Sequence, residues 1–192
     1  MKIINNKKEA IEELKRISTR TNSENNNKIN TIVEEILQEV KISGDIAVEK
    51  YTKKFDGFNP NPMQVSSDQI KKAWDELDNN LKRSLEVAHK RIQNFHKKET
   101  PQSFTIKGEF GDIVQRRWKP VKKAGIYIPG GRAAYPSTVL MNAIPAKVAG
   151  VKEIIMVSPG NKEGEINKTV LAAAHLSGIN KVFRIGGAQA IG

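Results

Sequence analysis

Apolar residues in the first part of the chain recur at the spacing of three and four that is typical of amphipathic helices. Over residues 7–17 they gather near one face, at Ala10, Ile11, Leu14 and Ile17. A second stripe runs over residues 29–40 and ends near Ser43–Gly44, where a glycine suits a helix C-terminus. The polar stretch 21–30 between the two stripes is predicted to be a linker.

The same spacing predicts further helices up to residue 98. Asp45 is expected to cap a helix whose inward residues are Ile46, Ala47, Tyr51 and Phe55. The segment FDGFNPNPM, at 55–63, is predicted to be a loop, and another helix begins near Ser67. A longer helix is expected over about 80–98, with an apolar row made of Leu81, Leu85, Ala88, Ile92 and Phe95.

Near Thr100–Pro101 the pattern changes to short alternating runs. SFTIKGEF and DIVQRRWKPV predict a β-hairpin. Three buried strands then follow, in AGIYIPGG, KEIIMVSPG and KVFRIGG, and they alternate with helices in STVLMNAIPAKVAG and over 163–177. The order βαβαβ is typical of a parallel sheet covered by helices.

The predicted fold class is therefore α/β, with an N-terminal helical arm, a short β-hairpin and an incomplete Rossmann-like βαβαβ parallel sheet. We place the helical region at residues 1–100, the hairpin and connector at 101–120, and the incomplete sheet domain at 121–192. AQAI after the last strand resembles the first turn of a helix, so residues 121–192 are expected to form the first half of a domain.

Composition narrows the possible functions. The chain has 192 residues, a net charge of +11, a mean hydropathy of −0.50 and no cysteine. A disulfide, a catalytic thiol and a thiolate zinc site are therefore excluded, and the lack of cysteine fits a reducing compartment. No apolar run is long enough to span a membrane, and the N-terminus lacks the apolar core of a secretory signal. The basic residues are dispersed among acids, which favours solvated surfaces over a nucleic-acid site.

Candidate chemistry lies at the carboxyl ends of the parallel strands, where open α/β sheets bind ligands. These ends carry Pro129–Gly130–Gly131, Ser158–Pro159–Gly160 and Gly186–Gly187. Such turns suit a phosphate or nucleotide, and equally a steric need for glycine. The standard dinucleotide and P-loop motifs are absent. Tyr127 and Gln189 could each contact a ligand at these ends. From local sequence alone, a core position is the better explanation of Tyr127, and a solvent-facing helix position is the better explanation of Gln189.

Other candidates have simpler explanations. Ser137 and Thr138 are expected to cap the first crossover helix. His89 and His96 lie seven residues apart on one helix, about 10 Å at 1.5 Å per residue, which is too far to share a metal. His175 belongs to another helix. The basic-aromatic cluster Arg116, Arg117 and Trp118 is expected at the polar edge of the hairpin.

Three segments carry a resemblance to a known family. AGIYIPGGRAAYPSTVLMNAIPAKVAG and KVFRIGGAQAIG resemble the two glycine segments of the histidinol dehydrogenases, and SGDIAVEKYTKKFDGF resembles their N-terminal helical region. The resemblance implies a cytoplasmic NAD-dependent, zinc-requiring oxidoreductase of histidine biosynthesis, which oxidises L-histidinol to L-histidine in two steps as a homodimer. It also implies that residues 121–192 belong to an NAD-binding domain, with Tyr127 and Gln189 as the cofactor-contacting residues.

The family's catalytic Glu-His pair and zinc ligands have no counterpart in this chain, so the resemblance implies no catalytic and no metal-binding residue here. The chain is expected to be an N-terminal fragment that is inactive alone, with no nucleic-acid or membrane partner. Two alternatives stay open: a basic nucleic-acid-binding module, and a non-catalytic partner that dimerises through its helical arm.

Overall fold

A computed structural model describes residues 3–18, 24–131 and 133–192. Its helices are α1 (Lys7–Ser18), α2 (Glu24–Ser43), α3 (Asp45–Phe55), α4 (Ser67–Asp75), α5 (Asn79–Glu99), α6 (Pro136–Val148) and α7 (Lys168–Leu176), and a short 3-10 helix, η2, spans Ala188–Ala190. Its strands are β1 (Gln64–Val65), β2 (Phe104–Lys107), β3 (Ile113–Arg116), β4 (Lys123–Tyr127), β5 (Glu153–Val157) and β6 (Lys181–Phe183). The α/β class predicted from the sequence is confirmed.

The strands form two sheets. The larger sheet has the order β1-β6-β5-β4, in which β4, β5 and β6 are parallel and β1 runs antiparallel to β6. The smaller sheet is the predicted hairpin of β2 and β3. The antiparallel strand β1 was missed because it is two residues long and has no alternating pattern of its own; Gln64 and Val65 are extended by pairing with Phe183 and Val182.

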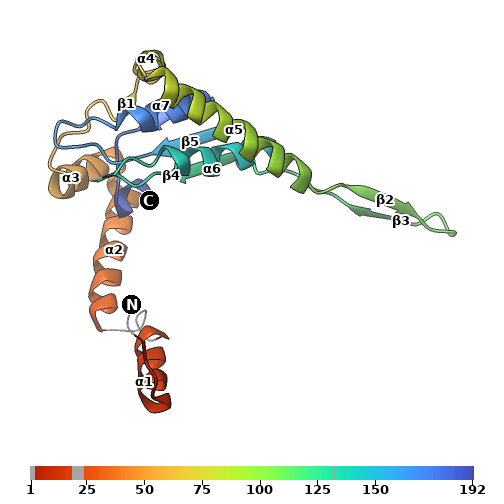
Figure 1. The fold of residues 1–192 in the computed structure, drawn as a ribbon, viewed down its shortest axis with the longest axis horizontal. Helices are drawn as coiled ribbons and strands as arrows, with labels where there is room; N and C mark the ends of the chain where they lie inside the picture. Colours follow the sequence, from red (N-terminus) through yellow and green to blue (C-terminus); the bar gives the residue numbers. More distant parts are fainter. Residues whose placement is uncertain (1–2, 19–23, 132) are drawn as a thin grey trace.

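Helices cover one face of the larger sheet. α6 and α7 pack against each other, α4 packs against α7, and α5 packs against α6 (Figure 1). The residues of each strand that point to these helices are buried, as Ile126, Met156 and Val182 show. The opposite face carries the half-buried Ile155 and Phe183, so the two faces of the sheet differ in cover.

A second, smaller cluster joins α2 and α3 to the end of the sheet. Its buried members are Ile36, Val40, Ala47, Val48 and Tyr51, and the partly buried Met63, Ile185 and Ala188 pack against it. The Tyr51 hydroxyl donates to Glu39 Oε2 at 2.5 Å and the Lys50 ammonium contacts Glu39 Oε1 at 2.5 Å, which fixes the α2–α3 angle.

Local signals explain where several helices begin and end. Gly44 has a φ of +55°, a left-handed conformation that glycine adopts without strain, and it ends α2 as predicted. Ser66 caps α4: its hydroxyl accepts from the N–H of Gln69 at 3.2 Å, and the Gln69 side chain accepts from the Ser66 N–H at 3.1 Å.

Some helix boundaries differ from prediction. Residues 24–30 of the expected linker are helical and belong to α2, because asparagine costs only a few tenths of a kcal/mol per helical position; residues 21–23 lie outside the described part. α7 begins at Lys168 and not at residue 163, since the Asn161 side chain accepts from the N–H groups of Glu163 and Glu165 and holds a turn there.

Other errors concern caps and helix faces. Asp45 does not cap α3: it is the first helical residue, after Gly44, which makes no side-chain cap. Ser137 and Thr138 lie inside α6, whose N-cap is Tyr135 without a side-chain hydrogen bond. Ile46, Phe55 and Phe95, predicted to face inward, are exposed in this chain. The spacing of apolar residues alone does not show which part of a wide apolar stripe packs against the core.

No described helix is long and apolar enough to cross a membrane.

We predict that the core of the larger sheet sets stability. Leu140 in α6 is 1% exposed, so Leu140→Ala should lower the free energy of unfolding by about 2–5 kcal/mol through lost burial and a residual cavity. The neighbouring Met141 is 64% exposed, and Met141→Ala should change the free energy of unfolding by less than about 0.5 kcal/mol. Denaturant unfolding of both variants measures this contrast. Equal losses would contradict the assigned orientation of α6.

Candidate site at the carboxyl ends of the parallel strands

The glycine turns that follow β4, β5 and β6 lie at one edge of the larger sheet. In the parallel register, Tyr127 is level with Val157, and Val157 is level with Phe183, so the three strands end together. A hollow of about 130 Å³ lies between the Pro129–Gly131 and Ser158–Asn161 turns. The three turns therefore meet at the edge where the sequence predicts a pocket.

Pro159 explains two of these glycines. A Cβ atom on Gly130 would lie 2.5 Å from the Pro159 ring, and one on Gly186 would lie 2.7 Å from it. The ring of Pro159 therefore packs against both neighbouring turns, and no larger residue fits at either position without displacement. The steric explanation is sufficient for Gly130 and Gly186. Gly187 needs glycine for another reason, its φ of +64°.

The structure brings both Tyr127 and Gln189 close to Gly187. The Tyr127 hydroxyl accepts a hydrogen bond from the Gly187 N–H at 3.1 Å, across 60 residues of sequence. The Gln189 Oε1 atom lies 2.5 Å from the position that a Cβ on Gly187 would take. Tyr127 is 36% exposed, at the end of β4, and can still present its ring to a ligand.

Gln189 is buried without hydrogen-bond partners. It is 2% exposed, and neither its Oε1 nor its Nε2 has a partner among the described residues. Its predicted solvent-facing position is therefore wrong, because η2 packs against α2 and α3. A buried polar group without a partner costs about 1–3 kcal/mol, which a polar group of a ligand could recover. An amide offers both a donor and an acceptor.

Asp56 is a further candidate that is not predicted from the sequence. It follows α3 and lines a second hollow, of about 400 Å³, together with Gly130, Gly131 and Gly160. One carboxylate oxygen is buried without a partner among the described residues, and burial raises the pKa of the Asp56 carboxyl above its usual value. Nothing in FDGFNPNPM marks this residue as part of a site, since α3 and the glycine turns meet only in the fold.

The histidines do not gather. His89 and His96 lie on α5 and His175 on α7, where its ring stacks on Trp74 with centroids 6.0 Å apart. Within the described ranges, no group of three or more His, Cys, Asp or Glu side chains is arranged to hold a metal ion.

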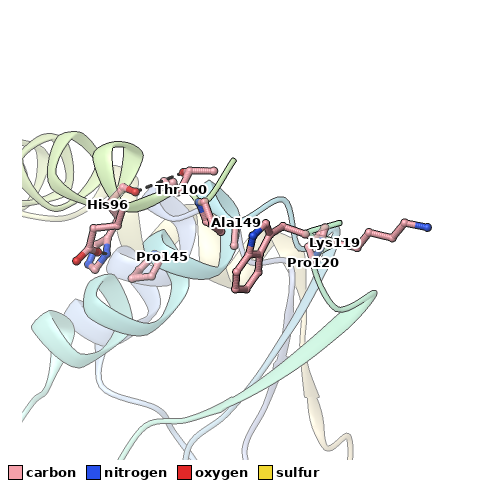
Figure 2. A pocket seen from close by; sticks show the side chains of 10 residues that line it. His96, Thr100, Lys119, Pro120, Pro145 and Ala149 are labelled. Atoms are coloured by element: carbon pink, nitrogen blue, oxygen red, sulfur yellow. Dashed lines mark hydrogen bonds and ion pairs between the residues drawn. The ribbon is translucent and has the colours of Figure 1, made fainter. Parts of the chain in front are cut away.

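A separate pocket of about 320 Å³ lies at the base of the hairpin, where α5, the end of β3 and α6 meet. Figure 2 shows His96 and Pro145 on one side of it and Lys119 and Pro120 on the other. Trp118 also lines the pocket, and the Arg116 guanidinium lies 4.9 Å from the centre of its ring. The pocket shares no lining residue with the hollows at the glycine turns.

Known proteins resemble this chain along most of its length. Residues 19–192 match the family described as histidinol dehydrogenase. Histidinol dehydrogenases of Prochlorococcus marinus strains MIT 9312 and CCMP1986 are 87% and 76% identical over all 192 residues. The chain spans less than half the length of these curated relatives, 44% and 45%, and matches their N-terminal part.

A solved structure shares the fold as well. The crystal structure of histidinol dehydrogenase from Elizabethkingia anophelis aligns with a TM-score of 0.80 and 37% sequence identity. The alignment covers 85% of this chain and 38% of that one.

We predict that Asp56 destabilises the fold when it is charged. Because its pKa is raised above the ordinary 3.8, the stability of the chain should fall as the pH rises from about 3.8 through the folded-state pKa. The charge also lies at the C-terminal end of α3, where the helix dipole disfavours anions. Asp56→Asn should therefore raise the free energy of unfolding at pH 7 by up to about 1 kcal/mol, a gain that vanishes near pH 3.8.

Asp75→Asn is the matched control, because hydrogen bonding to Lys71 lowers the pKa of Asp75. Asp75→Asn should lower the free energy of unfolding at pH 7, the opposite of the effect expected for Asp56→Asn. This loss should disappear as the pH falls below 3.8, the ordinary pKa of an aspartate, and through the lower folded-state pKa. Denaturant titrations between pH 3 and pH 8 measure both variants. A gain from Asp56→Asn that does not depend on pH would contradict the assignment to charge burial.

Proposed function

Because the chain belongs to the histidinol dehydrogenase family, we propose that it forms the NAD-binding part of an enzyme that oxidises L-histidinol to L-histidine in two successive NAD-dependent steps. The support is the match to residues 19–192 and the high identity to named relatives. The chain contributes one wall of the cofactor site and no catalytic residue. The chemistry that NAD supplies when bound is the acceptance of hydride from the alcohol and then from the aldehyde level.

The observation that carries this proposal is the arrangement around Gly187. Tyr127 and Gln189 are the two residues for which the resemblance implies NAD contacts. Both lie against Gly187, which is 60 residues from Tyr127 in the sequence. The Tyr127 ring, partly exposed at the strand end, would hold the cofactor by contact with its ring. The Gln189 amide supplies a donor and an acceptor that the protein leaves unpaired. Since Gln189 is buried, its contact requires the Gly186–Gly187 turn to move aside.

Asp56 extends this site. Its unpaired carboxylate oxygen beside the Gly130–Gly131 turn is suited to accept hydrogen bonds from the hydroxyl groups of a ribose. β5 carries no acid at its carboxyl end, so Asp56 provides from α3 the carboxylate that a nucleotide site uses there. A charged group that lowers stability and faces a hollow is a pattern typical of binding sites.

Further properties are proposed on the family relationship. Zinc, when bound, would help to position the hydroxyl of histidinol; the described residues provide no cluster for it, so we assign this chain no zinc ligand. We propose a homodimer in the cytoplasm. We propose no role in nucleic-acid binding, because the basic residues are dispersed among acids along the chain, and Lys123 and Lys181, for example, are paired with Glu153.

The function is tested with a chimera that joins residues 1–192 to the remaining part of the 87%-identical Prochlorococcus relative. Formation of NADH that depends on histidinol and zinc is the expected result. Tyr127→Phe and Gln189→Leu should each raise the KM for NAD about five- to tenfold, equivalent to about 1 kcal/mol, with little change in the KM for histidinol. A chimera that folds but produces no NADH would contradict the proposal.

Stability separates a cofactor role from a structural one. Gln189→Leu removes two unpaired buried polar atoms, so it should raise the free energy of unfolding by about 1 kcal/mol or more while it weakens NAD binding. Asp78→Ala is the stability control: it loses the cap of α5, where its carboxylate accepts from the N–H groups of Asn80 and Leu81, and it should lower stability by about 1 kcal/mol without affecting the KM for NAD. If Gln189→Leu destabilises the fold and leaves NAD binding unchanged, Gln189 is structural.

A further inference from the structure

A pocket of about 280 Å³ lies where α4 packs against α7 (Figure 1). One face of α4 lines it, at positions 69, 72, 73 and 76, which are three and four residues apart. The start of α7 and Arg184, which follows β6, line the rest. The pocket has Glu165 in common with the hollow of about 130 Å³ at the glycine turns and no lining residue in common with the hollow beside Asp56. It is a cavity that the proposed function does not use.

The floor of this pocket is apolar. It consists of buried aliphatic side chains from β1, from α4 and from the two sides of the α7 N-terminus, namely Val65, Ala73, Ile166 and Leu171, none of which is more than 8% exposed. The hydrocarbon part of a ligand would leave water on contact with this floor, which is favourable and requires no directed bond. The volume is just below the range of about 300–1,000 Å³ that is usual for ligand pockets, so it suits a small molecule.

Arg184 brings a cation to the apolar floor. Its backbone N–H donates to the Met63 carbonyl at 2.9 Å, which holds residue 184 in line with β6. Because side chains alternate along a strand, the Arg184 side chain lies on the same face of the sheet as the buried Val182, beneath the helices. Its Nη1 atom donates to the Gly164 carbonyl at 3.4 Å, and its Nε atom is buried without a partner among the described residues.

The free edge of the Arg184 guanidinium is suited to a carboxylate. With Nη1 directed to Gly164, Nε and Nη2 form the edge that has no partner in the part of the chain that the structure describes. The two N–H groups of such an edge are parallel, and they match the two oxygens of one carboxylate. A buried donor without a partner is unfavourable, so a carboxylate of a ligand would be bound in preference to a neutral group.

Two lysines add positive charge at the rim of the pocket. The Nζ atoms of Lys72 and Lys168 lie 3.6 and 3.5 Å from the carboxylate oxygens of Glu76. Because the lysine side chains are 72% and 77% exposed, these ion pairs are weak, and either ammonium group can turn to a ligand at little cost. Three cations and the carboxylates of Glu76 and Glu165 line the pocket, so its charge is 3 − 2 = +1 and one negative charge balances it.

We propose that the pocket between α4 and α7 binds a small organic monocarboxylate with a hydrocarbon body. The carboxylate pairs with the Nε–Nη2 edge of Arg184, and the hydrocarbon part lies on the apolar floor. Lys72 and Lys168 attract the anion at the rim. Both parts of the ligand are needed, since inorganic phosphate has nothing to place on the floor and an alcohol of the same length has no charge for Arg184.

Titration of the full chain with hexanoate, followed by NMR of its nitrogen-labelled form, tests this site. The Nε–H signal of Arg184, identified by its loss in Arg184→Lys, should shift until it saturates, together with the backbone amide signals of Ala73 and Leu171. Acetate, hexanol and inorganic phosphate, at the same ionic strength, should each bind at least about tenfold more weakly. A chain that shows no saturable shift with hexanoate overturns the proposal. Equal binding of acetate or phosphate also overturns it, because the site would then accept anions in general.

Variants identify the groups that hold the carboxylate. Arg184→Lys keeps the charge and loses the planar edge, so it should weaken hexanoate binding by about tenfold or more. Lys72→Gln and Lys168→Gln change exposed positions that do not endanger folding, and each should weaken binding by about two- to fivefold. Lys71→Gln is the matched control, because Lys71 pairs with Asp75 and does not line the pocket.

Two outcomes with these variants would contradict the proposal. One is hexanoate binding that is unchanged in a folded Arg184→Lys chain, and the other is a loss in Lys71→Gln as large as that in Lys72→Gln. None of the measurements uses NAD or histidinol, so their failure leaves the proposed enzymatic function untouched.

Discussion

The parallel register of β4, β5 and β6 is the constraint on which the site depends. Because the register makes Tyr127, Val157 and Phe183 level, the turns that follow these strands are forced to one edge and into mutual contact. Pro159 then packs against Gly130 and Gly186 on either side. At the same edge, the Gly187 N–H donates a hydrogen bond to the Tyr127 hydroxyl. This bond joins the turn after β6 to the end of β4, the outer of the three parallel strands. A shift of one residue in any strand would separate these groups, since side chains alternate between the faces.

Much of this arrangement follows from local sequence. The βαβαβ order, the hairpin and the termination of α2 at Gly44 are encoded by periodicity and by glycine, which act over a few residues. Features that arise from distant contacts could not be predicted in this way. Gln189 is buried because α2 and α3 cover η2, and Asp56 becomes part of a hollow because α3 ends beside the turn after β4. The residues next to Gln189 in the sequence do not indicate contact with α2 and α3, and those next to Asp56 do not indicate contact with the turn after β4.

Two kinds of locally unfavourable feature remain in the described part of the fold, and they point to two kinds of partner. At the sheet edge the unfavourable features are polar: the amide of Gln189 and one oxygen of Asp56 are buried without partners. A small ligand with hydrogen-bonding groups would satisfy them. At the β2–β3 hairpin they are apolar: Phe104, Ile106 and Phe110 are exposed to water. A second protein surface removes that cost, since it buries area without requiring directed bonds.

The helical arm and the candidate cofactor site are mechanically connected through the smaller cluster. Ile185 and Ala188 flank the Gly186–Gly187 turn, and both pack against the cluster formed by α2 and α3. The position of α2 is in turn held by Glu39, which bonds Lys50 and Tyr51 of α3. Any movement of the turn that opens Gln189 to a ligand must therefore displace side chains that α2 and α3 contact. The N-terminal helices thus belong to the support of the site, although none of the strands that build it lies among them.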